Sequence, residues 1–247
     1  MALRQVAAEQ RVFWRNRAAA FFTFLLPIMF LALLGALGSD STVDGVSYAQ
    51  YTVPGMVGMG IVVTAFAGLA ITLTIRRDTG VLKRLRGTPL PPATYLGALI
   101  ASMTIVLAAE TVVILVLGRS AFDVPLPDDW LQFLGVAVLG AACFSAMGVA
   151  VSRFVPNAEG SSAVVNAIYL PLLFLSGAFF PVDELPFVLR AVAELSPLTH
   201  LLEALRRLFA GGGLDGAQAV GLLVVLAWGA GAALLAARTF SWEPRGA

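Results

Sequence analysis

Few side chains in this sequence are of the types that carry out nucleophilic, acid–base or metal chemistry. His200 is the single histidine, which excludes a zinc centre built on two or three imidazoles from one chain. Cys143 is the single cysteine, so the chain forms no internal disulfide and no thiolate metal site. Ser176 and His200 could act as the nucleophile and base of an intramembrane protease, but Phe174 replaces the first glycine of the GxSG pattern. These residues argue against an enzyme.

Glu110 lies near the centre of a long apolar stretch. A carboxylate at that depth in a membrane costs roughly 2 to 3 kcal/mol unless it is protonated or satisfied. Its neighbours three and four residues away on the same helix are apolar, so a partner must come from another helix, and Asn166 is a candidate. A structural hydrogen bond between helices, a contact with a substrate or cation, and exposure to lipid all remain open.

A basic segment follows the second long apolar stretch. Gly80 can end one helix, and 81–86 places apolar and basic residues at helical spacing. The prolines in 89–92 then prevent continuation. This pattern predicts a short, rigid, basic helix. On composition alone, such basic residues set membrane topology or contact lipid headgroups.

The overall composition indicates which kind of structural element carries these residues. Of 247 residues, 59% are hydrophobic and 13% are charged, and the mean hydropathy is +0.87. One soluble core cannot hide that much apolar surface, so we predict an all-α integral membrane protein. The formal net charge of +1 gives no reason to expect nucleic acid. Stretches of about 20 apolar residues predict six transmembrane helices. They are 18–38, 51–75, 96–118, 130–152, 161–180 and 215–237.

The placement of basic residues predicts the orientation. With both termini cytoplasmic, twelve of the sixteen Lys and Arg residues fall on the inner side, and most acids fall outside. We predict an interfacial amphipathic helix at 1–17, although a basic tail that only fixes topology is the alternative. The remaining predicted segments are a cytoplasmic loop at 76–95, extracytoplasmic helices folded back within 181–213 and a cytoplasmic tail at 238–247.

Three parts of the chain resemble one family of membrane proteins. The run from Gly80 to Leu90 resembles a family pattern of a glycine, a basic amphipathic turn and a Thr-Pro-Leu end, and the family often has Glu at the position of Asp78. The run 174–181 together with 195–200 resembles "SGxFFP...NPLTY", with Ser196 and His200 in place of Asn and Tyr. The runs 15–30 and 51–55 add to the likeness. The chain thus resembles permease subunits of the ABC-2 type transporter family, which includes daunorubicin-resistance and nodulation-factor exporters.

This resemblance implies a non-catalytic transport subunit that binds no cofactor itself. A separate ABC ATPase subunit would hold ATP and Mg, which agrees with the absence of a GxxxxGK[ST] phosphate loop from this chain. A second permease copy, identical or paired, would complete the complex. The residues that the resemblance assigns to ATPase coupling are Asp78, Gly80, Leu82, Lys83, Arg84, Leu85 and Arg86.

The expected role is export of a small amphiphilic substrate, such as a drug, a lipid or a glycan-like molecule, across the plasma membrane of a bacterium. Drug efflux and antibiotic resistance are expectations of the same kind. The residues predicted along a substrate path are Glu110, Asn166, Phe174, Phe179 and Phe180. The three phenylalanines could instead anchor the protein at the membrane interface. An ATP-independent secondary transporter or channel, using Glu110, is the alternative function.

Overall fold

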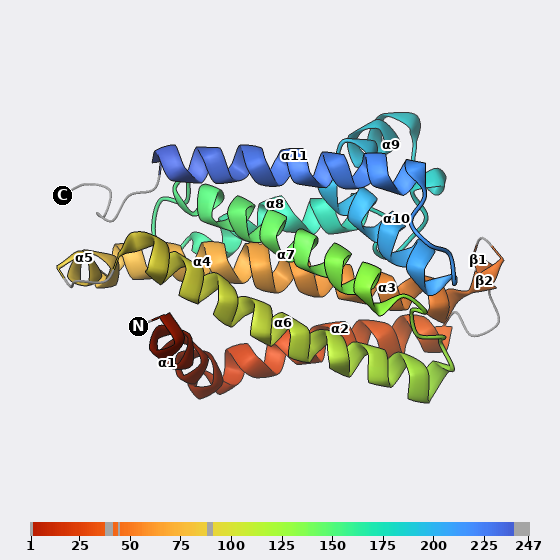
Figure 1. The fold of residues 1–247 in the computed structure, drawn as a ribbon, viewed down its shortest axis with the longest axis horizontal. Coiled ribbons are helices and arrows are strands. Elements are labelled where there is room, and N and C mark those ends of the chain that lie inside the picture. Colours follow the sequence, from red (N-terminus) through yellow and green to blue (C-terminus); the bar gives the residue numbers. More distant parts are fainter. Residues whose placement is uncertain (1, 38–41, 44, 88–90, 240–247) are drawn as a thin grey trace.

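The computed structural model describes residues 2–37, 42–43, 45–87 and 91–239. Its long helices lie side by side along the long axis of the molecule (Figure 1). They are α2 (Arg17–Leu37), α3 (Tyr48–Gly60) with the π-helix η1 (Ile61–Gly68) and α4 (Leu69–Asp78), α6 (Pro92–Phe122), α7 (Trp130–Ser152), α8 (Ser161–Leu175) and α11 (Gly216–Thr239). The strands β1 (Thr42–Val43) and β2 (Val46–Ser47) form one short antiparallel hairpin. The predicted all-α architecture is confirmed.

Five helical stretches among the described residues are long and apolar enough to cross a membrane. They are 17–36, 48–78, 93–122, 130–152 and 216–239. The fifth predicted stretch, 161–180, is helical only over Ser161–Leu175, which corresponds to about 22 Å of helix. Gly177 then adopts a left-handed conformation with φ of 86°, so the chain turns before a full span is complete. Prediction from the apolar run alone therefore placed this end five residues too late.

The continuous helix formed by α3, η1 and α4 occupies the centre of the bundle. In its most apolar window 78% of residues are buried, against 22% for α2 and 17% for α11. Gly148 of α7 permits close packing on this central helix, since a Cβ there would lie 2.6 Å from the carbonyl oxygen of Phe66. The outer helices expose large apolar side chains, which suits contact with lipid.

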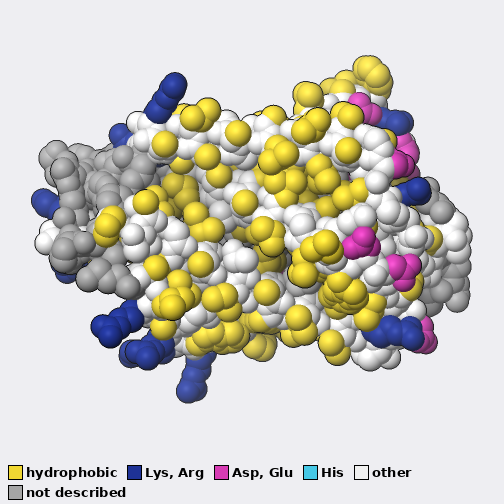
Figure 2. Space-filling view, in the orientation of Figure 1, with side chains coloured by type: hydrophobic (Ala, Val, Ile, Leu, Met, Phe, Trp, Pro, Cys, Tyr) yellow, Lys and Arg dark blue, Asp and Glu magenta, His cyan; other side chains and the backbone are white. Residues whose placement is uncertain are grey.

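The two ends of the bundle differ in structure and charge. The α5 end carries α1 (Ala2–Arg15), α5 (Val81–Arg86) and the last residues of α11 (Figure 1). The α9 end carries the hairpin, the 3-10 helix η2 (Val182–Glu184), α9 (Phe187–Glu194) and α10 (Pro197–Phe209). On the face shown in Figure 2, acidic side chains gather at the α9 end and most basic side chains at the α5 end. Most of the predicted tail, 240–247, lies outside the described residues.

Candidate functional site

The predicted basic helix exists as α5, held just beyond the end of the central helix. Gly80 joins α4 to α5 with φ of 70°, a conformation that suits glycine because it has no Cβ. Leu82 is buried in a small apolar cluster with Leu73 and Tyr95, whereas Lys83 and Arg84 are exposed. Leu85 packs against the same cluster. The helix therefore has an apolar side fixed to the bundle and a basic side facing outward.

Hydrogen bonds connect the base of α5 to the chain that follows α7. Arg77 donates from Nη1 to the carbonyl of Ser152 at 2.7 Å and from Nη2 to that of Val155 at 2.6 Å. The backbone N–H of Ala158 donates to Oδ2 of Asp78 at 2.9 Å. Asp78, predicted to belong to the coupling segment, thus joins two segments of the same chain at this end. Arg77 is a functional candidate that the sequence did not single out.

A buried ion pair links α1 to the same region. Arg76 donates from Nη1 and Nη2 to the two carboxylate oxygens of Glu9, at 2.8 and 2.6 Å, and from Nη1 to the hydroxyl of Tyr95 at 2.8 Å. Gln10 donates to the carbonyl of Ser102 at 2.7 Å. Paired charge-assisted bonds of this geometry are among the stronger polar contacts in proteins. Helix α1 is therefore attached to both α4 and α6, the helices on either side of α5.

Glu110 belongs to α6, its side chain faces η1, and it is 1% exposed. Its Oε2 accepts a hydrogen bond from Thr64 Oγ1 at 3.0 Å, and its Oε1 has no hydrogen-bond partner within the described part of the chain. The prediction that Asn166 of α8 is the partner is wrong, because the carboxyl group faces η1 and bonds to Thr64. A Cβ on Gly60 would lie 2.9 Å from Oε1, so this glycine makes room for the carboxyl group.

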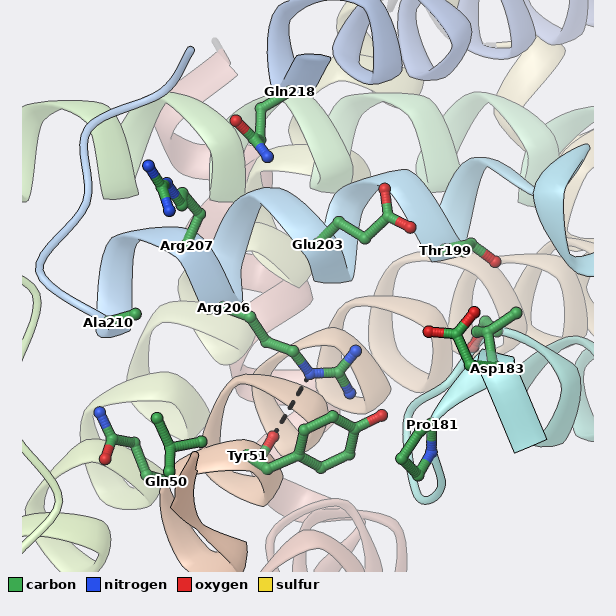
Figure 3. Close-up of a pocket in the computed structure, with 13 residues that line it drawn as sticks. Gln50, Tyr51, Pro181, Asp183, Thr199, Glu203, Arg206, Arg207, Ala210 and Gln218 are labelled. Atoms are coloured by element: carbon green, nitrogen blue, oxygen red, sulfur yellow. Dashed lines mark hydrogen bonds between the residues drawn. The ribbon is translucent and has the colours of Figure 1, made fainter. Parts of the chain in front are cut away.

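A cavity of about 400 Å³ opens at the α9 end, between α3, α10 and the segment 176–183. One face of α10 lines it with Thr199, Glu203, Arg206 and Arg207, and the opposite face of α10 is buried in the core (Figure 3). Because the cavity contains both acidic and basic side chains, it has the chemistry to receive a polar or zwitterionic group.

Arg206 fixes the wall of this cavity. Its guanidinium lies 3.8 Å from the ring centroid of Tyr51 and donates to the carbonyl of Tyr51 (Figure 3). It also donates to the carbonyl of Gly177. The Tyr51 hydroxyl donates to the same Gly177 carbonyl at 2.9 Å. The sequence did contain a signal for Arg206, which is one of the few basic residues on the predicted outer side.

The predicted aromatic residues lie beside this region but do not line the cavity. The ring of Phe179 is buried and its centroid is 5.2 Å from those of Phe30 and Phe174. Phe174 and Phe180 are about half exposed. Glu110 and Asn166 do not line the cavity either. The residues predicted along a substrate path are therefore not brought together at one site.

Comparison with known proteins agrees with this architecture. Residues 5–210 match the model of the ABC-2 type transporter family. The chain is 22% identical to the putative transport permease YvfS of Bacillus subtilis, over 85% of each chain. It is 28% identical to the inner membrane transport permease YadH of Escherichia coli, over 74% of this chain and 71% of that one. It is also 34% identical to nodulation protein J of Rhizobium leguminosarum bv. trifolii, over 39% of this chain and 38% of that one. The chain is a multi-pass membrane protein and belongs to the ABC-2 type transporter family.

Proposed function

We propose that this transporter subunit is the permease of an ABC exporter. It carries an amphiphilic substrate outward with ATP that a separate ATPase subunit hydrolyses, and α5 receives the movement of that ATPase. The α5 end then faces the cytoplasm of a bacterial cell, as the basic residues there favour. A second permease copy, identical or related, completes the path.

The attachment of α5 is the observation that carries this proposal. The helix projects beyond the apolar stretches, where a soluble partner can reach Lys83 and Arg84. At its base, Leu82 is buried and Arg77 and Asp78 bind the segment 152–158. A force on α5 therefore reaches the ends of several membrane helices at once, as movement of coupled rigid elements requires.

The cavity at the α9 end supports an amphiphilic substrate. Its mixed charges suit a polar headgroup, and the apolar helix surfaces suit a hydrocarbon portion. Drug, lipid and glycan-like substrates all fit this description, and drug efflux is one form of the proposal.

Charge reversal on α5 tests the coupling role. We expect Lys83→Glu combined with Arg84→Glu to abolish the substrate-stimulated part of ATP hydrolysis by the purified complex. The matched control is Arg11→Glu with Arg15→Glu, which makes the same charge change on exposed residues of α1. The control should retain stimulation. Protease accessibility of both variants in membrane vesicles checks that the topology is unchanged.

Two results would contradict the proposal. Unchanged stimulation in the α5 variant would remove α5 from coupling. Purification of tagged protein from native membranes in several mild detergents, without an ATPase chain or ATP hydrolysis, would favour the ATP-independent carrier or channel instead. A stoichiometric ATPase chain carrying a phosphate loop is the expected result.

A further inference from the structure

Glu110 is isolated from every other charge in the membrane part of the bundle. The stretches 18–37, 48–75, 92–118, 130–152, 161–175 and 216–237 contain no other Asp, Glu, Lys, Arg or His. Along α6, the nearest charged residue toward the α9 end is Arg119, nine residues away and exposed, which corresponds to about 13 Å. A carboxylate at this position therefore has no cationic neighbour within the described membrane helices.

The helices packed against Glu110 place few other ionisable side chains near it. Toward the α5 end, α1 reaches α6 at Ser102, about 12 Å along the helix from Glu110. The acidic residue of α1 there, Glu9, is already paired with Arg76. On α3, Tyr51 lies at the α9 end and binds Gly177, and on α7, Cys143 faces Gly229 of α11. No ionisable group on α2 faces the carboxyl either, because residues 18–37 contain none of the charged types, no Tyr and no Cys.

The immediate surroundings suit a neutral acid rather than an anion. A carboxylate needs several donors to replace water, but among the described residues only Thr64 donates to Glu110, and Oε1 is buried and finds no partner among them. A metal ion or an ammonium group would need space beside Oε1, where even a Cβ on Gly60 would lie only 2.9 Å away. A proton on the carboxyl neutralises it and needs no added volume.

We propose that Glu110 is a proton-binding site. The carboxyl binds a proton while α6 is packed against η1, and it releases that proton to water when the contact opens. The 3.0 Å contact suits both forms, because the Thr64 hydroxyl can donate to Oε2 or a protonated Oε2 can donate to the hydroxyl. Thr64 lies within a π-helical segment, a geometry that occurs often at functional sites.

The site also lies between the two membrane segments that flank α5. The central helix enters α5 from one side, and α6 leaves on the other. If α5 couples to an ATPase, a step that separates η1 from α6 would also release this proton. That consequence rests on the proposed function, whereas the proton site itself does not.

Infrared spectroscopy of the purified permease tests occupancy directly. At neutral pH the wild-type protein should show a carboxylic acid C=O stretching band that Glu110→Gln removes. The control Glu159→Gln changes an exposed glutamate and should leave the band in place. A wild-type spectrum without this band, or a band that survives in Glu110→Gln, would overturn the proposal.

Thermal unfolding tests release. An unfolded glutamate is ionised above about pH 4.3, so a proton held in the folded state is lost on unfolding at neutral pH. Because the folded state binds more protons, wild-type stability should fall as pH rises, relative to Glu110→Gln. Parallel pH profiles for the two proteins would mean that unfolding releases no proton from Glu110, which would overturn the proposal. Both measurements use the permease alone, so their failure leaves the ATPase-coupling experiment unaffected.

Discussion

A double-mutant cycle on Glu9 and Arg76 would measure how firmly α1 is attached to the α5 end. The side chains are 6% and 16% exposed, and two N–H groups of Arg76 meet the two oxygens of Glu9 at 2.6 and 2.8 Å. Removing one partner of a buried pair costs about 3 to 5 kcal/mol. Arg76 keeps its bond to Tyr95 and some contact with solvent, so we expect Glu9→Ala to cost about 3 kcal/mol.

The coupling energy between the two positions isolates the ion pair from the other contacts of each side chain. From Glu9→Ala, Arg76→Ala and the double variant, we expect a coupling energy of about 2 kcal/mol. The assay is equilibrium chemical unfolding in mild detergent, followed by tryptophan fluorescence.

A matched pair in the same protein provides the control for this cycle. Asp183 and Arg190 also approach to 2.6 Å, but their side chains are 77% and 46% exposed. Exposed pairs contribute about 0 to 1 kcal/mol, so this second cycle should yield a smaller coupling energy. The reasoning is refuted if the Glu9–Arg76 coupling is no larger than that of the exposed pair, since burial would then have had no effect.

Two further substitutions test the packing and the cavity wall. Gly148→Ala should destabilise the protein by about 2 kcal/mol, because the new Cβ would lie 2.6 Å from a backbone carbonyl oxygen of η1. Gly135→Ala is the control, since a Cβ there meets nothing within 4 Å, and it should stabilise the protein by up to about 1 kcal/mol. If both substitutions shift the unfolding midpoint in the same direction relative to wild type, this reasoning is contradicted. Tyr51→Phe should cost about 1 kcal/mol for the lost bond to Gly177, with the ring still beside Arg206. Binding of a zwitterionic detergent headgroup should weaken less in Tyr51→Phe than in Arg206→Ala.

Local sequence patterns were sufficient to predict most of the long helices and the short basic helix α5. Runs of apolar residues identified five membrane-crossing helices, and Gly80 before a basic amphipathic turn identified α5. The ends were less accurate, because helices continue through polar residues. The second stretch begins at Tyr48 rather than 51 and ends at Asp78 rather than 75. In the fifth stretch, 161–180, the left-handed Gly177 follows the end of the helix although the residues after it are still apolar.

The contacts at the candidate sites depend on how helices are rotated against one another. The bond from Thr64 to Glu110 joins residues 46 apart, and the pair formed by Glu9 and Arg76 joins residues 67 apart. Each helix that carries these residues is apolar or basic on several sides, so periodicity does not indicate which neighbour a given side chain meets. Glu9 is the single acidic residue in the basic segment 2–15, which could have indicated an ion pair but does not identify Arg76 as the partner.

The strengths of these contacts indicate where neighbouring helices should separate first when α5 moves. At the α5 end, the Glu9–Arg76 pair and the burial of Leu82 hold α1, α4 and α6 together, and the bonds of Arg77 join α4 to the end of α7. Breaking the Glu9–Arg76 pair alone costs about 3 kcal/mol. In the middle of the bundle, the polar contact between η1 and α6 is one hydrogen bond, worth about 1 kcal/mol. A displaced α5 should therefore carry its attached helix ends as one body. Opening should begin near Glu110, where a polar side chain gains water as the helices part.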